Sequence, residues 1–207
     1  MPLQYITHGK VNIYKVMCVP YLCEDMSVKH SEKTYRKAFK DEQKRIKDNK
    51  KFGYIQLMLG RNPVIKVTTP VMKCLFGIKQ SQGDNFNMSL QFKNVQQDDE
   101  MMSFFEFVQG LEYHMMNNLG LTEEDSGRFI SQIKYDKQRK YDPNLSVKLP
   151  FSCNKFETEL YSNHSSIVSL FNINNFTDMQ CDIYLDKIWK INDTFHCKWK
   201  CSCIHLV

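Results

Sequence analysis

The stretch CDIYLDKIWKINDTFHCKWKCSCIHLV, residues 181–207, decides the fold class of this chain. Apolar and polar residues alternate on both sides of Asn192-Asp193, and Asn and Asp tolerate the left-handed backbone that tight turns need. The pattern predicts two strands, 181–191 and 194–207, joined as a hairpin. One face of the second strand is expected to be apolar, with Trp199 and the cysteines, and the other to carry lysines.

Further strand signals lie upstream of this hairpin. Each is a short run of alternating, β-branched or aromatic residues, and Pro70 closes one of them. The runs are 3–20 (one or two strands), 52–60, 63–69, 86–92, 129–135, 146–151, 156–161 and 167–171. Many short strands without a strand–helix–strand rhythm predict a mainly β (α+β) protein built as a barrel or sandwich.

One segment, residues 98–120, has a helical period instead. Its Met, Phe, Val and Leu residues recur every three or four positions, which predicts a helix. The acidic run Asp98-Asp99-Glu100 suits the positive end of a helix dipole, and Gly120 suits the C-terminal cap. Such an apolar stripe is typical of core packing. We therefore expect a helix packed on the barrel, and an acidic run that caps it rather than binds a metal.

The composition is that of one globular domain spanning residues 1–207. Apolar residues make up 42% of the chain and charged residues 25%, which are ordinary values for a soluble protein. No run approaches the roughly 20 apolar residues that cross a bilayer, and the first residues do not resemble a signal peptide. We expect an intracellular protein with no membrane partner, whose 8 cysteines are reduced.

The net charge of +5 is concentrated in one segment. Residues 27–51 contain 10 basic and 4 acidic residues, or +6, so the other residues sum to −1. Two interpretations are open and compatible: a solvated amphipathic helix, or a basic arm that contacts phosphates.

Motifs of the common enzyme classes are absent. The sequence has no phosphate-binding loop, dinucleotide fingerprint, nucleophile elbow or HExxH pair. Cys197, Cys201, Cys203 and His205 are expected to face one way on a strand, where alternate side chains are about 7 Å apart. That spacing is too wide for the ligands of one zinc ion. We therefore expect core thiols, no metal site and no cofactor.

A further stretch mixes cations with aromatic residues, from Lys134 to Tyr141 and on to Lys148 and Phe151. Single-stranded nucleic acid is bound by this mixture, because aromatic faces stack bases while Lys and Arg neutralise phosphates. A solvated loop has the same composition, so the mixture alone leaves both interpretations open.

The runs VTTPVMKCLFGI (67–78) and FNMSLQF (86–92), the helix, LPF at 149–151 and the closing lysine-tryptophan strands resemble a viral family. It is the family of single-stranded DNA-binding proteins of nucleocytoplasmic large DNA viruses, which includes a relative in African swine fever virus. The resemblance covers about residues 52–206. Its matching positions are Thr69, Pro70, Phe76, Gly77, Lys187, Trp189, Lys198, Trp199 and Lys200. Some of these are expected to serve the fold, including Pro70, Gly77 and at least one tryptophan.

The resemblance implies an oligonucleotide-binding-type β-barrel without enzymatic activity, which coats single strands during viral DNA replication, recombination or repair. The implied partners are single-stranded DNA or RNA, other copies of the chain on DNA, and other replication proteins. The implied location is the host cytoplasm or nucleus at viral replication sites, or the virion. The expected nucleic-acid-binding residues are Phe52, Tyr54, Lys66, Lys73, Phe76, Lys79, Lys134, Tyr135, Lys137, Arg139, Lys140, Tyr141, Lys198 and Lys200.

Two alternatives stay open from the sequence. One is a protein-interaction module of a viral replication or virion complex, whose barrel docks a peptide. The other is a nuclease or another metal-dependent enzyme, which needs two or three carboxylates that converge in a cleft. The available acidic clusters are Asp98-Asp99 and Glu123-Glu124-Asp125, which flank the predicted helix.

Deletion of residues 27–51 tests the basic-arm interpretation. We expect weaker binding to single-stranded DNA and a flatter salt dependence, because fewer counterions are released when fewer lysines contact phosphates. Titrations of a labelled oligo-dT at several salt concentrations measure this, with a melting curve to show that the domain still folds. An unchanged salt slope would contradict the basic-arm interpretation and favour the solvated helix.

Overall fold

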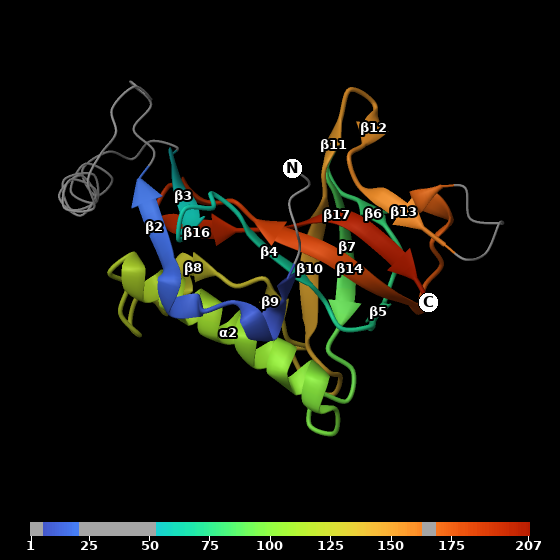
Figure 1. Ribbon diagram of the computed structural model, residues 1–207, viewed down its shortest axis with the longest axis horizontal. Coiled ribbons are helices and arrows are strands. Elements are labelled where there is room, and N and C mark those ends of the chain that lie inside the picture. Colours follow the sequence, from blue (N-terminus) through green and yellow to red (C-terminus); the bar gives the residue numbers. More distant parts are fainter. Residues whose placement is uncertain (1–5, 21–52, 163–168) are drawn as a thin grey trace.

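The computed structural model describes residues 6–20, 53–162 and 169–207 (Figure 1). The basic segment 27–51 and Phe52 lie outside these ranges, as do Cys23 and residues 163–168. Within the described ranges, no helix is long and apolar enough to cross a membrane.

The centre of the molecule is a closed five-stranded β-barrel. Strand β5 (Met72–Cys74) pairs with β7 (Phe86–Gln91), β7 with β10 (Asn144–Leu149), β10 with β17 (Trp199–Leu206), β17 with β14 (Thr177–Leu185), and β14 again with β5. The β10–β17 pair is parallel and the others are antiparallel. If the five barrel strands are numbered in chain order, their order around the barrel is 1-2-3-5-4. This is the Greek-key order of oligonucleotide-binding barrels. The predicted fold class is therefore confirmed.

The first barrel strand bends at a proline. Strand β4 (Ile65–Thr68) and β5 both pair with β14, and residues 69–71 separate them. Pro70 has no N–H to donate to a ladder. Thr69 bridges the break instead, because its N–H donates to the Cys181 carbonyl (2.9 Å) and its hydroxyl accepts from the Cys181 N–H (3.0 Å). Thr69 and Pro70 of the matched motif thus serve the fold.

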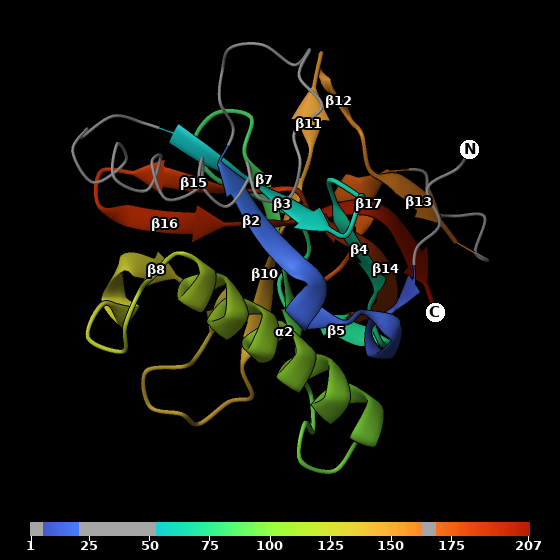
Figure 2. The same cartoon turned by 60° about the vertical axis from the view of Figure 1, so that its left-hand side comes forward.

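A second sheet projects from the barrel. Its order is β2 (Val16–Pro20), β3 (Gly53–Leu59), β15 (Lys187–Ile191), β16 (Thr194–Cys197) and β8 (Phe129–Ile130). Figure 2 shows β15 and β16 extending from the barrel strands as a hairpin. The predicted turn at Asn192-Asp193 is confirmed, and Asn192 has the positive φ of 53° that such turns require.

The single predicted helix is α2, Asp99–Asn118. The Asp98 side chain accepts from the Met101 N–H (3.0 Å), which is the capping role expected of it. Phe104 is fully buried against Phe92, with ring centroids 5.9 Å apart. The His114 ring hydrogen-bonds the Val16 carbonyl (3.0 Å), which ties the helix to β2. The helix thus underlies both the barrel and the second sheet (Figures 1 and 2).

The remaining elements are short. They are β1 (Ile6–Thr7), β6 (Lys79–Gln80), β9 (Ile133–Lys134), β11 (Phe151–Ser152), β12 (Lys155–Phe156), β13 (Glu159–Tyr161) and the 3-10 turns η1 (His8–Lys10), η2 (Ile13–Lys15), η3 (Ser126–Arg128) and η4 (Leu170–Asn172).

Several sequence predictions need correction. The two strands predicted at 181–191 and 194–207 are each two strands, broken at Asp186 and Lys198, so that each segment contributes to both sheets. The strand predicted at 129–135 is likewise divided, because β8 pairs in the second sheet and β9 pairs with β10. Within 167–171, the described residues enter a 3-10 turn rather than a strand.

The cysteines lie mostly in the core. Cys18, Cys74, Cys181, Cys197 and Cys201 are buried, and burial raises the pKa of the Cys18 thiol to about 12. Cys153 departs from the expectation, because it is exposed. Trp199 is also core, with 1% of its surface exposed, as expected for one of the tryptophans.

The predicted common face of Cys197, Cys201, Cys203 and His205 is wrong. A β-bulge shifts the β14–β17 register, since Ile183 pairs with Cys201 but Asp182 pairs with Cys203. The extra residue in β17 reverses its alternation. Trp199 and Cys201 therefore point inward before the bulge, whereas Ile204 and Leu206 do so after it.

Gly77 is required by two constraints at once. Its φ is +61°, and a Cβ on it would lie 2.6 Å from the Ile173 carbonyl oxygen. Gly83 has a similar φ of +62° but open space around it. We expect Gly77→Ala to lower the free energy of unfolding by more than Gly83→Ala, for which the left-handed conformation alone costs about 1–2 kcal/mol. Equal losses in urea denaturation would show that the Ile173 contact relaxes freely.

Candidate nucleic-acid interface

The outer surface of the barrel carries a row of paired polar residues. Strand alternation points one set of side chains outward, and the register aligns that set across six strands. Each member pairs directly with the next, in the order Lys79, Asn87, Lys148, Lys200, Tyr184 and Lys66. Three of the sequence-predicted residues (Lys66, Lys79 and Lys200) are thereby placed in one row around the barrel.

Cations gather where this row crosses β10 and β17. Lys148 pairs with Lys200, and Lys198 precedes Trp199, which pairs with Val147. Lys134 pairs with Asn144 at the other end of β10. We call Lys134, Lys148, Lys198 and Lys200, with His196, the basic strip.

The pKa shifts of two residues of the basic strip indicate that its charged groups interact with one another. Burial, and then the charges of Lys198 and Lys200, lower the pKa of Lys148 below its ordinary value. Burial, and then Lys198 and Lys134, lower the pKa of His196. Like charges therefore oppose protonation along the strip. A bound anion would relieve that repulsion, so the strip is suited to phosphate.

Asp186 offsets part of this charge. Its carboxylate accepts from the Lys200 ammonium at 2.8 Å and lies 3.7 Å from that of Lys187. Since Asp186 is also the break between β14 and β15, it fixes two lysines at the junction between the barrel and the second sheet.

The second sheet presents aromatic rings on one face. Tyr54 pairs with Trp189, and Trp189 with His196, so the three rings form an aromatic row across β3, β15 and β16. The Tyr54 and Trp189 ring centroids are 5.2 Å apart. The Lys187 ammonium lies 4.9 Å from the Tyr54 centroid and 5.2 Å from the Trp189 centroid, which are cation–π distances.

His196 belongs to both the basic strip and the aromatic row. The two are therefore continuous, and the surface carries cations and rings side by side. This mixture suits a charged backbone with flat bases. The inward residues of the same sheet are buried, including Ile188 and Phe195.

The predicted loop residues lie at one end of β10. Lys137, Arg139 and Lys140 are exposed on the connection from β9 to β10. Tyr135 and Tyr141 are 54% and 64% exposed. The Lys140 ammonium lies 5.6 Å from the Tyr141 ring centroid, and the Tyr135 hydroxyl accepts from the Gln109 side chain (2.9 Å) on α2.

Two predicted residues are held apart from the basic strip. Lys73 on β5 forms an ion pair with Asp178 (2.8 Å) and donates to the Phe176 carbonyl (3.1 Å). Phe76 is 51% exposed in the turn after β5. Phe52 lies outside the described residues, and its assignment stays a prediction.

Sequence reasoning did not include Lys148 or His196 among the binding residues. Lys148 belongs to the mixed stretch of cations and aromatic residues in the sequence, and it meets Lys200 because β10 and β17 pair in parallel. Lys187 and Trp189 were matched by the resemblance but not selected. The alternation along each strand indicates which side chains share a face. It does not indicate which strands pair, so it could not predict that these residues lie together.

One residue in each acidic cluster of the nuclease alternative has a structural partner. Asp98 caps α2, and Asp125 accepts from Arg128 at 3.0 Å. These contacts favour a structural role for both.

No protein-family model matches the chain, and no curated protein matches it. Solved structures similar to it include the single-stranded DNA-binding protein from bacteriophage Enc34, at 11% identity over 74% of this chain and 83% of that chain, with a TM-score of 0.47. The same phage protein in complex with ssDNA has 9% identity over 74% and 89%, with a TM-score of 0.45. Gp2.5, the single-stranded DNA-binding protein of bacteriophage T7, has 10% identity over 70% and 86%, with a TM-score of 0.46. With identities of 9–11% and TM-scores below 0.5, these likenesses are distant.

Proposed function

We propose that this protein binds single-stranded DNA without sequence preference. The observation that carries the proposal is the continuity of the basic strip with the aromatic row through His196. The strip offers charges spaced along β10 and β17, and the row offers ring faces beside it. Duplex DNA hides its base faces by stacking them, so an aromatic row favours single strands.

Affinity in this proposal has two separable parts. Lys134, Lys148, Lys198 and Lys200 neutralise phosphates and release counterions, which makes binding salt-dependent. Tyr54 and Trp189 stack bases, at about 1–3 kcal/mol per base. Neither contribution depends on base identity. Catalysis is not part of the proposal.

The finer role follows from the sequence resemblance. We propose that the protein coats single strands during viral DNA replication, recombination or repair, alongside other replication proteins and other copies of itself. RNA is a second ligand to compare, because its single strands offer the same phosphates and base faces. The proposed location is the intracellular site of viral replication.

The first test is a fluorescence polarisation titration of oligo-dT at several salt concentrations. We expect binding that weakens steeply with salt, and weaker binding to a duplex of equal length. Lys148→Ala should reduce the slope of log K against log salt by about 0.7, the contribution of one single-strand phosphate contact.

Lys10→Ala is the matched control, since Lys10 is exposed on η1 beside α2; its slope should not change. Absence of binding at low salt, or tighter binding to the duplex, would overturn the proposal. Salt-insensitive binding of a peptide would instead support the protein-interaction alternative.

The second test separates stacking from charge. Trp189→Ala should weaken oligo-dT binding by about 5- to 150-fold, equivalent to 1–3 kcal/mol, with little change in salt slope. Binding should quench the emission of Trp189 and leave that of buried Trp199, so the variant should lose the quenching. Tyr113→Ala, at an exposed tyrosine on α2, is the control. A Trp189→Ala variant with unchanged affinity would contradict base stacking and leave electrostatic attraction as the mode of binding.

A further inference from the structure

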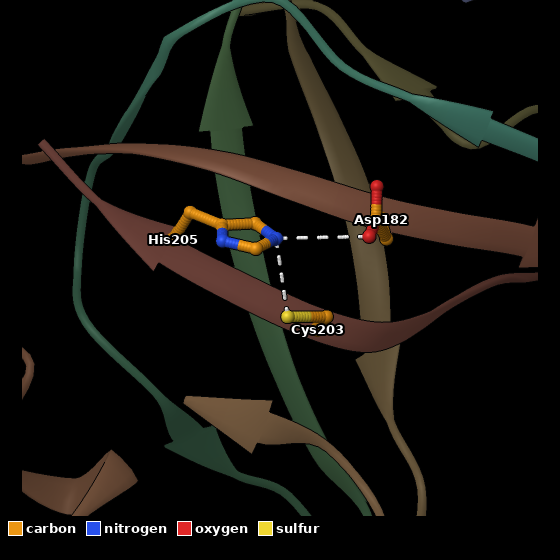
Figure 3. Close-up of side chains that lie close together, drawn as sticks. All are labelled: Asp182, Cys203 and His205. Atoms are coloured by element: carbon orange, nitrogen blue, oxygen red, sulfur yellow. Dashed lines mark hydrogen bonds and ion pairs between the residues drawn. The ribbon is translucent and has the colours of Figure 1, made fainter. Parts of the chain in front are cut away.

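A cluster of three potential metal ligands lies on the outward-facing side of β14 and β17, where Cys203 is buried and Asp182 and His205 are half-buried. Asp182, Cys203 and His205 place one ligand atom each within 4.8 Å of the others. Figure 3 shows the thiol and the carboxylate both directed at the same imidazole nitrogen. Among the described residues, this is the group whose donor set and spacing suit a metal ion.

The β-bulge creates the cluster. Without it, Cys203 would continue the inward series of Trp199 and Cys201. With it, Asp182 pairs with Cys203 instead of Ser202, and Cys203 shares the outer face with His205. Bulges are known to re-aim a side chain at functional positions. Cys203 and His205 are still next-but-one residues on one strand, whose spacing of about 7 Å argued against zinc, but their side chains converge so that the ligand atoms are 3.2 Å apart.

The distances agree with one coordination sphere. The Cys203 Sγ lies 3.2 Å from the His205 Nε2, and the Asp182 Oδ2 lies 3.6 Å from the same nitrogen. Ligands about 2.0–2.3 Å from a tetrahedral zinc are about 3.3–3.8 Å from one another.

The thiol and the carboxylate both face a single nitrogen. That nitrogen, Nε2, is a donor in one tautomer of His205 and an acceptor in the other. A divalent cation interacts favourably with all three atoms.

Neighbouring groups orient two of the ligands. The Thr68 hydroxyl donates to the Asp182 Oδ1 (2.6 Å), which leaves Oδ2 directed at the cluster. The Tyr161 ring stacks on the His205 ring, with an interplanar angle of 11° and centroids 5.3 Å apart. A hydrogen bond to the carboxylate, such as that from Thr68, is typical of metal ligands.

We propose that Asp182, Cys203 and His205 bind one zinc-class divalent cation, with a water molecule in the fourth position. A sulfur, nitrogen and oxygen donor set suits zinc better than magnesium or calcium, which prefer oxygen. Binding forms a bond from the metal to the Cys203 sulfur, and the thiol proton passes to solvent. The ion links β14 to β17 across their outer face, so it is expected to stabilise the barrel closure.

The site lies outside the basic strip, although the charge of Asp182 acts on Lys66 of the outer polar row. Cys203 lies three residues beyond Lys200 on β17, about 10 Å along the strand. The inference therefore stands or falls independently of single-strand binding.

The test uses the full chain after chelator treatment, titrated with Co²⁺ and then Zn²⁺. We expect one Co²⁺ per chain, a thiolate-to-cobalt charge-transfer band, its loss when Zn²⁺ is added, and a higher melting temperature with either metal. Cys203→Ser should remove the charge-transfer band. His205→Ala should weaken binding by more than the 10- to 100-fold cost of losing an outer-shell partner.

Cys153→Ser is the matched control, because Cys153 is an exposed thiol away from the cluster. It should keep the band and the thermal shift. Absence of a thiolate band in the parent chain would overturn the proposal, as would a band that survives in Cys203→Ser and disappears in Cys153→Ser. His205 is part-exposed, at 44% of its side chain, so its variant remains informative if Cys203→Ser does not fold.

Discussion

The pairing of β14 with β17 is the interaction on which the rest of the structure depends. Backbone hydrogen bonds between these strands close the barrel, and both strands then continue past Asp186 and Lys198 into the second sheet. The same two segments thus set the position of the barrel surface and of the β15–β16 hairpin. Because that geometry is fixed by the backbone, the basic strip and the aromatic row are held next to each other without relying on flexible side chains.

That arrangement carries an electrostatic cost. The pKa values of Lys148 and His196 are lowered by burial and by neighbouring lysines, and Asp186 relieves only the lysines at the junction. Unlike a fold-stabilising ion-pair network, the strip keeps cations facing cations. Retaining such repulsion on a half-buried surface is understandable if an anion binds there, which links the fold to the proposed function.

The alternation along strands and the capping of the helix made part of this structure predictable from the sequence. The two-residue alternation of KIWKI, the turn at Asn192-Asp193 and the capping of α2 by Asp98 each follow from local backbone and side-chain geometry, although it is Lys190 that is buried and Ile191 that is exposed. The break at Lys198 was not predictable, because the alternation runs through it from Cys197 to Trp199. At Asp186 the alternation shifts by one residue, since Leu185 and then Ile188 face inward, but a single predicted strand passes over that shift. The second sheet was missed because neither break was predicted, and with it the aromatic row as a surface.

The sequence by itself determined which side chains could be outward on each strand, since the period of two is a property of the extended backbone. Only the tertiary structure decided which outward side chains meet. Lys148 faces Lys200 through a parallel pairing, and Cys203 reaches Asp182 and His205 through a one-residue bulge. Register is set by the packing of the whole core, so a shift of one residue exchanges the faces of a strand. No local pattern encodes that choice.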